Sequence, residues 1–131
     1  MSDPIPFEEE QEWQVRICRP AFQDFHMIFS RYYARSVLNR QLLKLRWWNP
    51  DQPQVVDLQW DVVPDTGLCQ LVVEPSGVIR TGVRVIFLEH SADPAIPTLW
   101  VLGGTRIDDE LSDLQKMLFV CRSMIVKERA D

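Results

Sequence analysis

Two arginines stand near one another in a strand–loop–strand segment of the sequence. Arg84 lies in the apolar run 82–88, and Arg106 follows the apolar run 99–102 and two glycines. If the two runs pair as a β-hairpin, both guanidinium groups can lie on one face or rim of a sheet. Two converging guanidinium groups are what a site for a phosphate backbone needs. The alternative is that both arginines are solvated surface residues.

A histidine ends the strand that carries Arg84. His90 follows Glu89 directly, and a histidine side chain can take up or release a proton near neutral pH. His90 is therefore a candidate general acid or base beside the two arginines. The alternative interpretation is a surface residue at the end of a strand.

Further basic residues precede this segment. Arg31 and Arg35, and likewise Arg40 and Lys44, are four residues apart, so each pair would share one face of a helix. Tyrosine and tryptophan residues are interleaved with them, and such rings can stack on bases. The pattern predicts an RNA-binding surface, unless the rings face the core and the basic side chains face water. The predicted RNA-binding residues are Arg31, Arg35, Arg40, Lys44 and Arg80.

Metal and cofactor motifs are missing from the sequence. The three cysteines are far apart and lie in apolar patterns, which favours buried thiols over a zinc site. Asp108, Asp109 and Glu110 are adjacent, and adjacent helical positions point in different directions, so we interpret them as the first turn of a helix. We predict no metal and no cofactor.

Composition limits the class of protein. The chain has 131 residues and a net charge of −5, which argues against non-specific binding to nucleic acid. Residues 1–11 are acidic and rich in proline, and we expect a flexible arm there, followed by a single α+β domain over residues 12–131. No apolar run approaches the length of a membrane span, and the N-terminus does not resemble a signal peptide. We therefore expect a cytoplasmic protein.

The periodicity predicts an α+β fold. Alternation over residues 13–18 indicates an N-terminal strand, and apolar residues at helical spacing follow over 20–46, as one helix or a helical hairpin. Residues 56–62, 68–73 and 82–88, with 99–102, indicate an antiparallel meander of three to four strands. The sequence then predicts a C-terminal helix from about residue 107.

The C-terminal helix is apolar over an unusually wide arc. Residues at alternating four- and three-residue steps run from Ile107 to Ile125, and Met117, Val120 and Met124 widen the stripe. The stripe indicates either a well-buried helix or a helix that also receives a partner chain. A homodimer through this helix is one such arrangement.

Three short motifs carry a family resemblance. They are residues 67–73, which follow a turn glycine, residues 82–87 with Arg84, and residues 99–106, in which a leucine-rich strand leads through glycine to Arg106. With the order of elements, residues 65–118 resemble the RelE/ParE superfamily of toxins from toxin–antitoxin pairs, in particular HigB-like and addiction-module-killer-like members.

The resemblance implies a ribosome-dependent mRNA endoribonuclease. In such enzymes basic residues hold the scissile phosphate and stabilise the transition state, and the 2′-hydroxyl of the RNA is the nucleophile. Arg84 and Arg106 match the family's basic positions, and the implied partners are a cognate antitoxin, the mRNA and the ribosome. The strand over 68–74 lacks the family's lysines, however, and no tyrosine follows Arg106. These departures, with the acidic composition, predict a weakened or inactive nuclease.

A second class of function stays open on composition alone. A small acidic α+β chain with an apolar terminal helix also suits a non-catalytic protein-binding module, such as a type III secretion chaperone or an immunity-type binder. The two classes differ in what they bind: an endoribonuclease binds RNA, and a binding module takes a segment of another protein.

Overall fold

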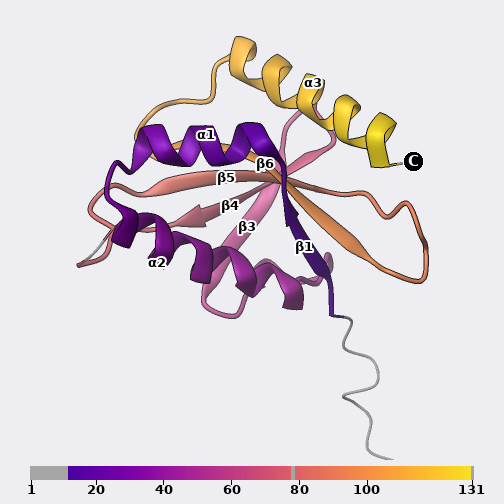
Figure 1. Cartoon of the computed structure of the whole chain (residues 1–131), viewed down its shortest axis with the longest axis horizontal. Coiled ribbons are helices and arrows are strands. Elements are labelled where there is room, and N and C mark those ends of the chain that lie inside the picture. Colours follow the sequence, from indigo (N-terminus) through magenta and orange to yellow (C-terminus); the bar gives the residue numbers. More distant parts are fainter. Residues whose placement is uncertain (1–11, 78, 131) are drawn as a thin grey trace, which may run out of the picture.

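One mixed sheet carries the helices of this protein (Figure 1). The computed structural model describes residues 12–77 and 79–130, and the predicted acidic arm over 1–11 lies outside them. The elements, in order, are β1 (Gln14–Ile17), α1 (Arg19–Ile28), α2 (Tyr32–Leu42), the 3-10 helix η2 (Leu43–Trp47), β2 (Gln54–Val55), β3 (Leu58–Val63), β4 (Leu68–Val73), β5 (Val83–Glu89), β6 (Thr98–Arg106) and α3 (Asp113–Ala130). The predicted α+β class and the C-terminal helix are confirmed.

The sheet contains more strands than the predicted meander. Within the described residues its order is β1-β6-β5-β4-β3-β2, and the neighbours from β2 to β6 are antiparallel. β1 pairs parallel with β6, so the sheet is mixed and not purely antiparallel. A parallel pair needs a long connection. Here the four remaining strands, β2 to β5, lie between β1 and β6 in the sequence, together with α1 and α2.

The final strand is longer than predicted because its two glycines lie inside it. β6 continues through Arg106 instead of ending at residue 102. A Cβ atom on Gly103 would collide with the side chains of Arg122 and Phe119, and one on Gly104 would collide with Phe25. The two glycines thus allow the side chains of α1 and α3 to approach the strand closely.

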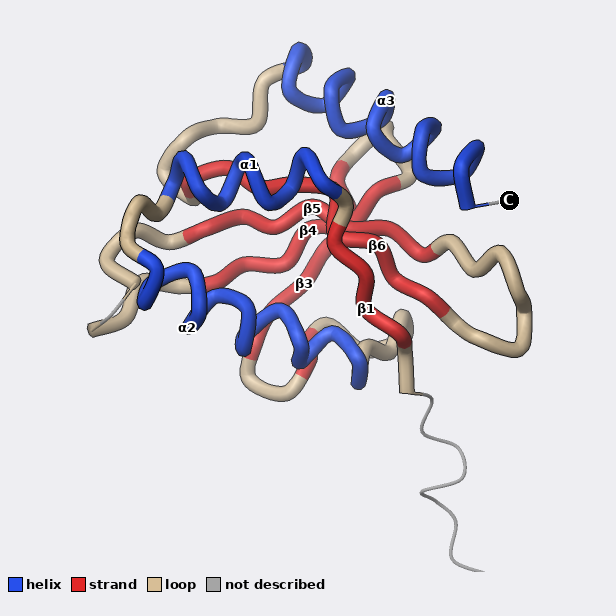
Figure 2. Tube along the Cα trace, viewed as in Figure 1, coloured by secondary structure: helices blue, strands red, loops and turns tan. Residues whose placement is uncertain are grey.

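The helical region 19–47 is a hairpin of two α-helices with a 3-10 turn at its end (Figure 2). The guanidinium group of Arg35 donates hydrogen bonds to the carbonyl oxygens of Phe29, at 2.8 Å, and Ser30, at 3.0 Å. These bonds satisfy backbone acceptors in the connection between α1 and α2. Arg35 is therefore occupied in holding the hairpin.

The C-terminal helix begins later than predicted. α3 starts at Asp113, so Asp108, Asp109 and Glu110 lie in the preceding connection and not in its first turn. The start is fixed by a capping box: the Ser112 hydroxyl accepts from the Gln115 N–H at 3.1 Å, and the Gln115 side chain accepts from the Ser112 N–H at 3.0 Å.

Apolar side chains pack on both faces of the sheet. One cluster joins α1, α2 and the sheet and includes Leu38, Leu42, Val85 and Phe87, while the other packs Phe119 and Val126 of α3 on Ile86 and Leu102. Trp48, which the sequence offered as a ring for stacking on bases, is buried in the first cluster. Among the described helices, none is both long and apolar enough to cross a bilayer.

Candidate functional site

The strand register separates the two arginines that the sequence predicted as a pair. Arg84 of β5 lies opposite Thr105 of β6, whereas Arg106 lies opposite Val83. Successive side chains on a strand point to opposite faces, and directly opposed residues share a face. Arg84 and Arg106 therefore belong to opposite faces of the sheet, and this pair of strands does not form the predicted two-arginine cleft.

Contacts with its own chain hold the Arg84 side chain. Its guanidinium group donates to the carbonyl oxygen of Asp109 at 2.8 Å and to the hydroxyl of Thr105 at 3.2 Å. Asp109 lies in the connection between β6 and α3, so Arg84 ties that connection to the sheet. Arg106 is exposed.

The predicted RNA-binding residues lie in different environments. Lys44 pairs with Asp57 at 2.6 Å, and that ion pair lowers the pKa of the Asp57 carboxyl group. Arg31 and Arg80 line one small hollow beside the connection between α1 and α2, and Arg40 is exposed on α2. With Arg35 bonded to the backbone, these side chains do not form one continuous basic surface.

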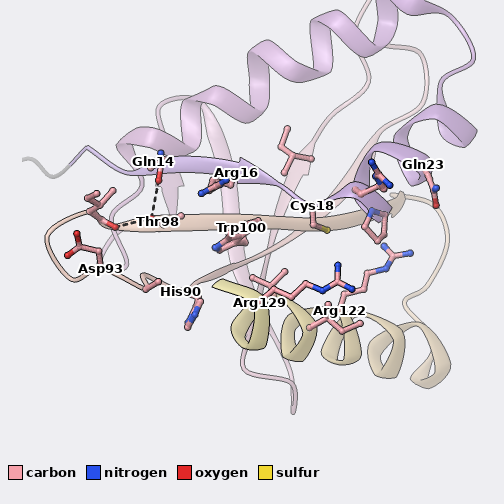
Figure 3. A pocket seen from close by; sticks show the side chains of 17 residues that line it. Gln14, Arg16, Cys18, Gln23, His90, Asp93, Thr98, Trp100, Arg122 and Arg129 are labelled. Carbon is pink, nitrogen blue, oxygen red and sulfur yellow. Dashed lines mark hydrogen bonds between the residues drawn. The ribbon is translucent and has the colours of Figure 1, made fainter. Parts of the chain in front are cut away.

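The structure assembles a different group of arginines in one hollow. A pocket of about 790 Å³ lies between β1, the β5–β6 connection and the C-terminal half of α3 (Figure 3). We call it the arginine pocket, after Arg16, Arg19, Arg122 and Arg129. Its other lining residues are Gln14, Ile17, Cys18, Pro20, Gln23, His90, Ala92, Asp93, Ile96, Thr98, Trp100, Ile125 and Val126.

The parallel pairing of β1 with β6 builds the floor of this pocket. Arg16 lies opposite Trp100, and its guanidinium carbon is 5.0 Å from the centre of the ring. Gln14 lies opposite Thr98 and accepts a hydrogen bond from its hydroxyl at 3.4 Å. Figure 3 shows both pairs on the side of the two strands that faces the pocket. Cation–π contact thus holds the Arg16 guanidinium group over the ring of Trp100.

An ion pair between α1 and α3 forms one end of the pocket. Arg122 donates to both carboxylate oxygens of Asp24, at 2.6 and 3.2 Å, and to the carbonyl oxygen of Leu102 at 3.0 Å. Asp24 also accepts from the backbone N–H of Gly104 at 3.1 Å, so the carboxylate bonds to β6 where β1 has ended. Arg122 is thus a positioned residue whose charge is offset by a neighbour.

Two other guanidinium groups of the pocket stay available. Arg19 and Arg129 are exposed, and neither has a hydrogen-bond or ion-pair partner among residues 12–77 and 79–130. Among residues 12–77 and 79–130, Asp93 is the only acid that lines the pocket; it lies on the β5–β6 connection and accepts from the backbone N–H of Ala95. The pocket therefore combines positive charge at its rim with apolar side chains within it, although the chain as a whole is acidic.

The half-buried thiol of Cys18 lines the arginine pocket. Burial raises the pKa of this thiol above its usual value; the backbone N–H of Ala21 and the charge of Arg122 act in the opposite direction, and the charge of Asp24 raises the pKa. Burial, together with the smaller effects of the charges of Asp61 and Glu89, raises the pKa of Cys69, on β4, to about 11. Burial is the largest cause of the raised pKa at both thiols. The prediction that all three cysteines are buried is wrong for Cys121, which is exposed.

His90 is the one predicted catalytic residue that lines the arginine pocket. It lies at the end of β5, and its backbone N–H donates to the carbonyl oxygen of Thr98 at 3.0 Å. No group of three or more histidine, cysteine, aspartate or glutamate side chains able to hold a metal ion occurs within the part of the chain that the structure describes.

Sequence reasoning missed most of the pocket because its residues are distant in the chain. Arg16 lies in the predicted strand over 13–18, and Arg122 and Arg129 are seven residues apart and thus near one face of α3. No local pattern indicates that β1 pairs with β6, which is the step that brings Arg16 to Trp100. No family model, curated protein or solved structure matches the chain.

Proposed function

We propose that this protein is a non-catalytic binding module whose arginine pocket receives an acidic, partly apolar segment of a partner protein. One observation carries the proposal: Arg19 and Arg129 present guanidinium groups without partners among the described residues, at the rim of a hollow with an apolar interior. A carboxylate accepts two parallel hydrogen bonds from one guanidinium group, and an apolar side chain beside it can fill the pocket.

The covered aromatic ring of the pocket and the net charge of the chain favour a peptide over a nucleic acid. Trp100 is the aromatic ring that lines the pocket, and Arg16 already lies over it. Single-stranded nucleic acids are commonly held by open rings on which successive bases stack. The net charge of −5 further opposes a polyanion, whereas a short segment with a few carboxylates is affected mainly by the local field.

A ribosome-dependent mRNA endoribonuclease of the RelE-like kind is a second candidate, favoured by the position of His90. This histidine lines the same hollow as the four arginines, so a group that can transfer a proton is near groups that can stabilise a phosphorane. In this alternative, arginines of the pocket take the role that the resemblance gives to Arg84 and Arg106.

A binding measurement with two double variants tests the first proposal. The probe is a fluorescein-labelled peptide of alternating glutamate and leucine, followed by fluorescence anisotropy. We expect Arg16→Gln/Arg19→Gln to weaken binding about tenfold or more, since a hydrogen bond to a charged group contributes about 1.5–3 kcal/mol. Arg31→Gln/Arg40→Gln removes the same charge outside the pocket and is the matched control.

The outcomes of this measurement are distinct. Equal losses in the two double variants would mean that the peptide responds only to net charge, which contradicts the proposal. Tighter binding of a single-stranded RNA of the same length would also contradict it and would favour the nuclease. For that second candidate, induced expression must arrest growth and cleave mRNA, and His90→Ala must abolish both effects while leaving the circular dichroism spectrum unchanged.

A further inference from the structure

The amino-terminal arm of this chain has the composition that the arginine pocket is proposed to recognise. Residues 1–11 contain four carboxylates, no lysine, arginine or histidine, and the apolar side chains of Ile5 and Phe7. We call this segment the acidic arm, after Asp3, Glu8, Glu9 and Glu10. The pocket has the complementary composition, because the exposed guanidinium groups of Arg19 and Arg129 lie at its rim and apolar side chains lie within it.

The acidic arm joins the described chain at one end of the pocket. Its last residue is three positions before Gln14, which begins β1 and lines the pocket. The backbone N–H of Gln14 donates to the carbonyl oxygen of Pro97 at 2.8 Å, so the start of β1 is fixed to the β5–β6 connection. Figure 3 shows Gln14 at one end of the pocket and Arg122 towards the other. The arm is therefore tethered beside the pocket by only a few residues.

The acidic arm is longer than the floor of the pocket. Residues 3–10 can span about 26 Å, whereas β1, which forms the floor over Gln14–Ile17, is about 10 Å long. A chain reversal needs only the four residues of a β-turn. With the reversal over 10–13, Phe7 is level with Arg16 on the floor. The length of the arm thus allows its aromatic ring to reach the apolar interior and its acids to reach the rim.

Tethering favours the acidic arm over a separate molecule of the same composition. A ligand that is joined to its site by a short linker acts at an effective concentration of about a millimolar. Pro4 and Pro6 each fix φ, which lowers the conformational entropy that the segment loses when it docks. Even a weak contact between the arm and the pocket is therefore enough to fill the pocket for most of the time.

We propose that the acidic arm docks into the arginine pocket of its own chain and competes there with the segment of a partner protein. Glutamates of the arm pair with Arg19 and Arg129, and Phe7 enters the apolar interior. The inference rests on the proposed function of the pocket and adds its regulation. A partner must displace the arm, so the arm sets the affinity that a partner needs.

A substitution that leaves the charge unchanged tests the competition. Phe7→Ala in the full chain should bind the glutamate–leucine peptide about fivefold more tightly than the wild type does, because a site that is open for about one-fifth of the time loses that factor in apparent affinity. Met27→Ala, at an exposed methionine of α1, is the matched control and should bind as the wild type does. Fluorescence anisotropy measures all three proteins. Equal affinity of Phe7→Ala and the wild type would overturn the proposal.

A charge variant tests the acids of the arm. Glu8→Gln/Glu9→Gln/Glu10→Gln should also tighten peptide binding by several-fold, because the arginines at the rim lose their competing carboxylates. The matched control removes three acids outside the arm and the pocket, as Asp51→Asn/Asp65→Asn/Glu110→Gln. An equal gain in both triple variants would mean that the peptide responds to net charge alone, which contradicts the docking of the arm.

The indole N–H signal of Trp100 tests the docking without any peptide. Phe7→Ala should shift this signal, because the variant removes an aromatic ring from the pocket that Trp100 lines, whereas Met27→Ala should leave it unchanged. The shift should persist over about a hundredfold dilution, since an intramolecular contact does not depend on protein concentration. An unchanged Trp100 signal, or a shift that disappears on dilution because a second chain supplies the arm, would overturn the proposal.

The two readouts separate this inference from the proposed function. If no protein binds the peptide but Trp100 responds to Phe7→Ala, the proposed partner segment is wrong and the docking of the arm is supported. If every protein binds the peptide equally and Trp100 does not respond, the pocket binds its partner and the inference about the arm is wrong.

Discussion

The arginines of β5 and β6 and those of the arginine pocket differ in how the sheet arranges them. Arg84 and Arg106 come from adjacent antiparallel strands, yet the register places them on opposite faces. Arg16 and Arg129 are far apart in sequence, yet the pairing of β1 with β6 and the packing of α3 bring them to one hollow. Proximity along two paired strands therefore says little about a shared site unless the register is known.

The two regions also differ in what their guanidinium groups are bonded to. Arg84 has hydrogen-bond acceptors in Thr105 and Asp109, so its role here is to hold the chain between β6 and α3. In the pocket, Arg122 is held by Asp24, whereas Arg19 and Arg129 have no partner among the described residues. A bonded arginine supports the structure, and an available one can bind a ligand.

The largest expected effect concerns the end of the arginine pocket that the Asp24–Arg122 ion pair forms. Gly103→Ala places a Cβ where the Asp24–Arg122 pair and the ring of Phe119 lie. We expect unfolding free energy to fall by about 1–3 kcal/mol, the usual cost of overpacking. Gly77→Ala is the control, because a Cβ there meets no atom within 4 Å. Chemical denaturation measures both, and equal stability of the two variants would contradict this description of the pocket.

The next largest effect is a difference in unfolding free energy between variants of Arg84 and of Arg106. Arg84→Ala removes two hydrogen bonds and should lower the unfolding free energy by about 1–2 kcal/mol, whereas Arg106→Ala should change it by less than about 0.5 kcal/mol. Thermal or urea unfolding provides the comparison. Matching losses in the two variants would mean that Arg106 has a structural role that its exposed position does not indicate.

The smallest expected effect compares the thiol of Cys18, which lines the arginine pocket, with the thiol of Cys69 on β4. A thiolate is the reactive form of cysteine, so a higher pKa lowers reactivity at a given pH. The exposed Cys121 should be alkylated first, then Cys18, and Cys69 last, because the pKa of Cys69 is raised to about 11. Mass spectrometry after iodoacetamide treatment between about pH 8 and pH 10 measures the order. Faster alkylation of Cys69 than of Cys18 would contradict it.

Local sequence patterns predicted the strands and helices well where neighbouring residues alone determine them. The run 68–73, predicted as a strand, is β4, and the turn before it ends at Gly67, whose φ of +74° explains the choice of glycine. The start of α3 was misplaced because three acids suggested a first turn, although the Ser112–Gln115 capping box was also present in the sequence. The residues at 112–115 thus carried the signal for the correct start of α3.

Non-local pairing explains what the sequence did not predict. The parallel β1–β6 contact joins residues 14–17 to 98–101, and nothing within either segment identifies the other. The arginine pocket depends on that contact, so only His90 among the predicted catalytic residues lies there. The predicted RNA-binding residues were judged by helical spacing, which does not show that Arg35 bonds to the backbone of the α1–α2 connection or that Lys44 pairs with Asp57.

An NMR titration tests the central claim most directly, because the chain carries two Arg–Trp pairs in different places. Arg16 lies over Trp100 inside the pocket, and Arg46 lies over the exposed Trp47 outside it, 5.5 Å from the ring centre. Indole N–H signals, assigned through Trp→Phe variants, are followed as the glutamate–leucine peptide is added. The binding proposal predicts a saturable shift of the Trp100 signal with Trp47 unchanged; a shift at Trp47 alone, or no shift at Trp100, would contradict it.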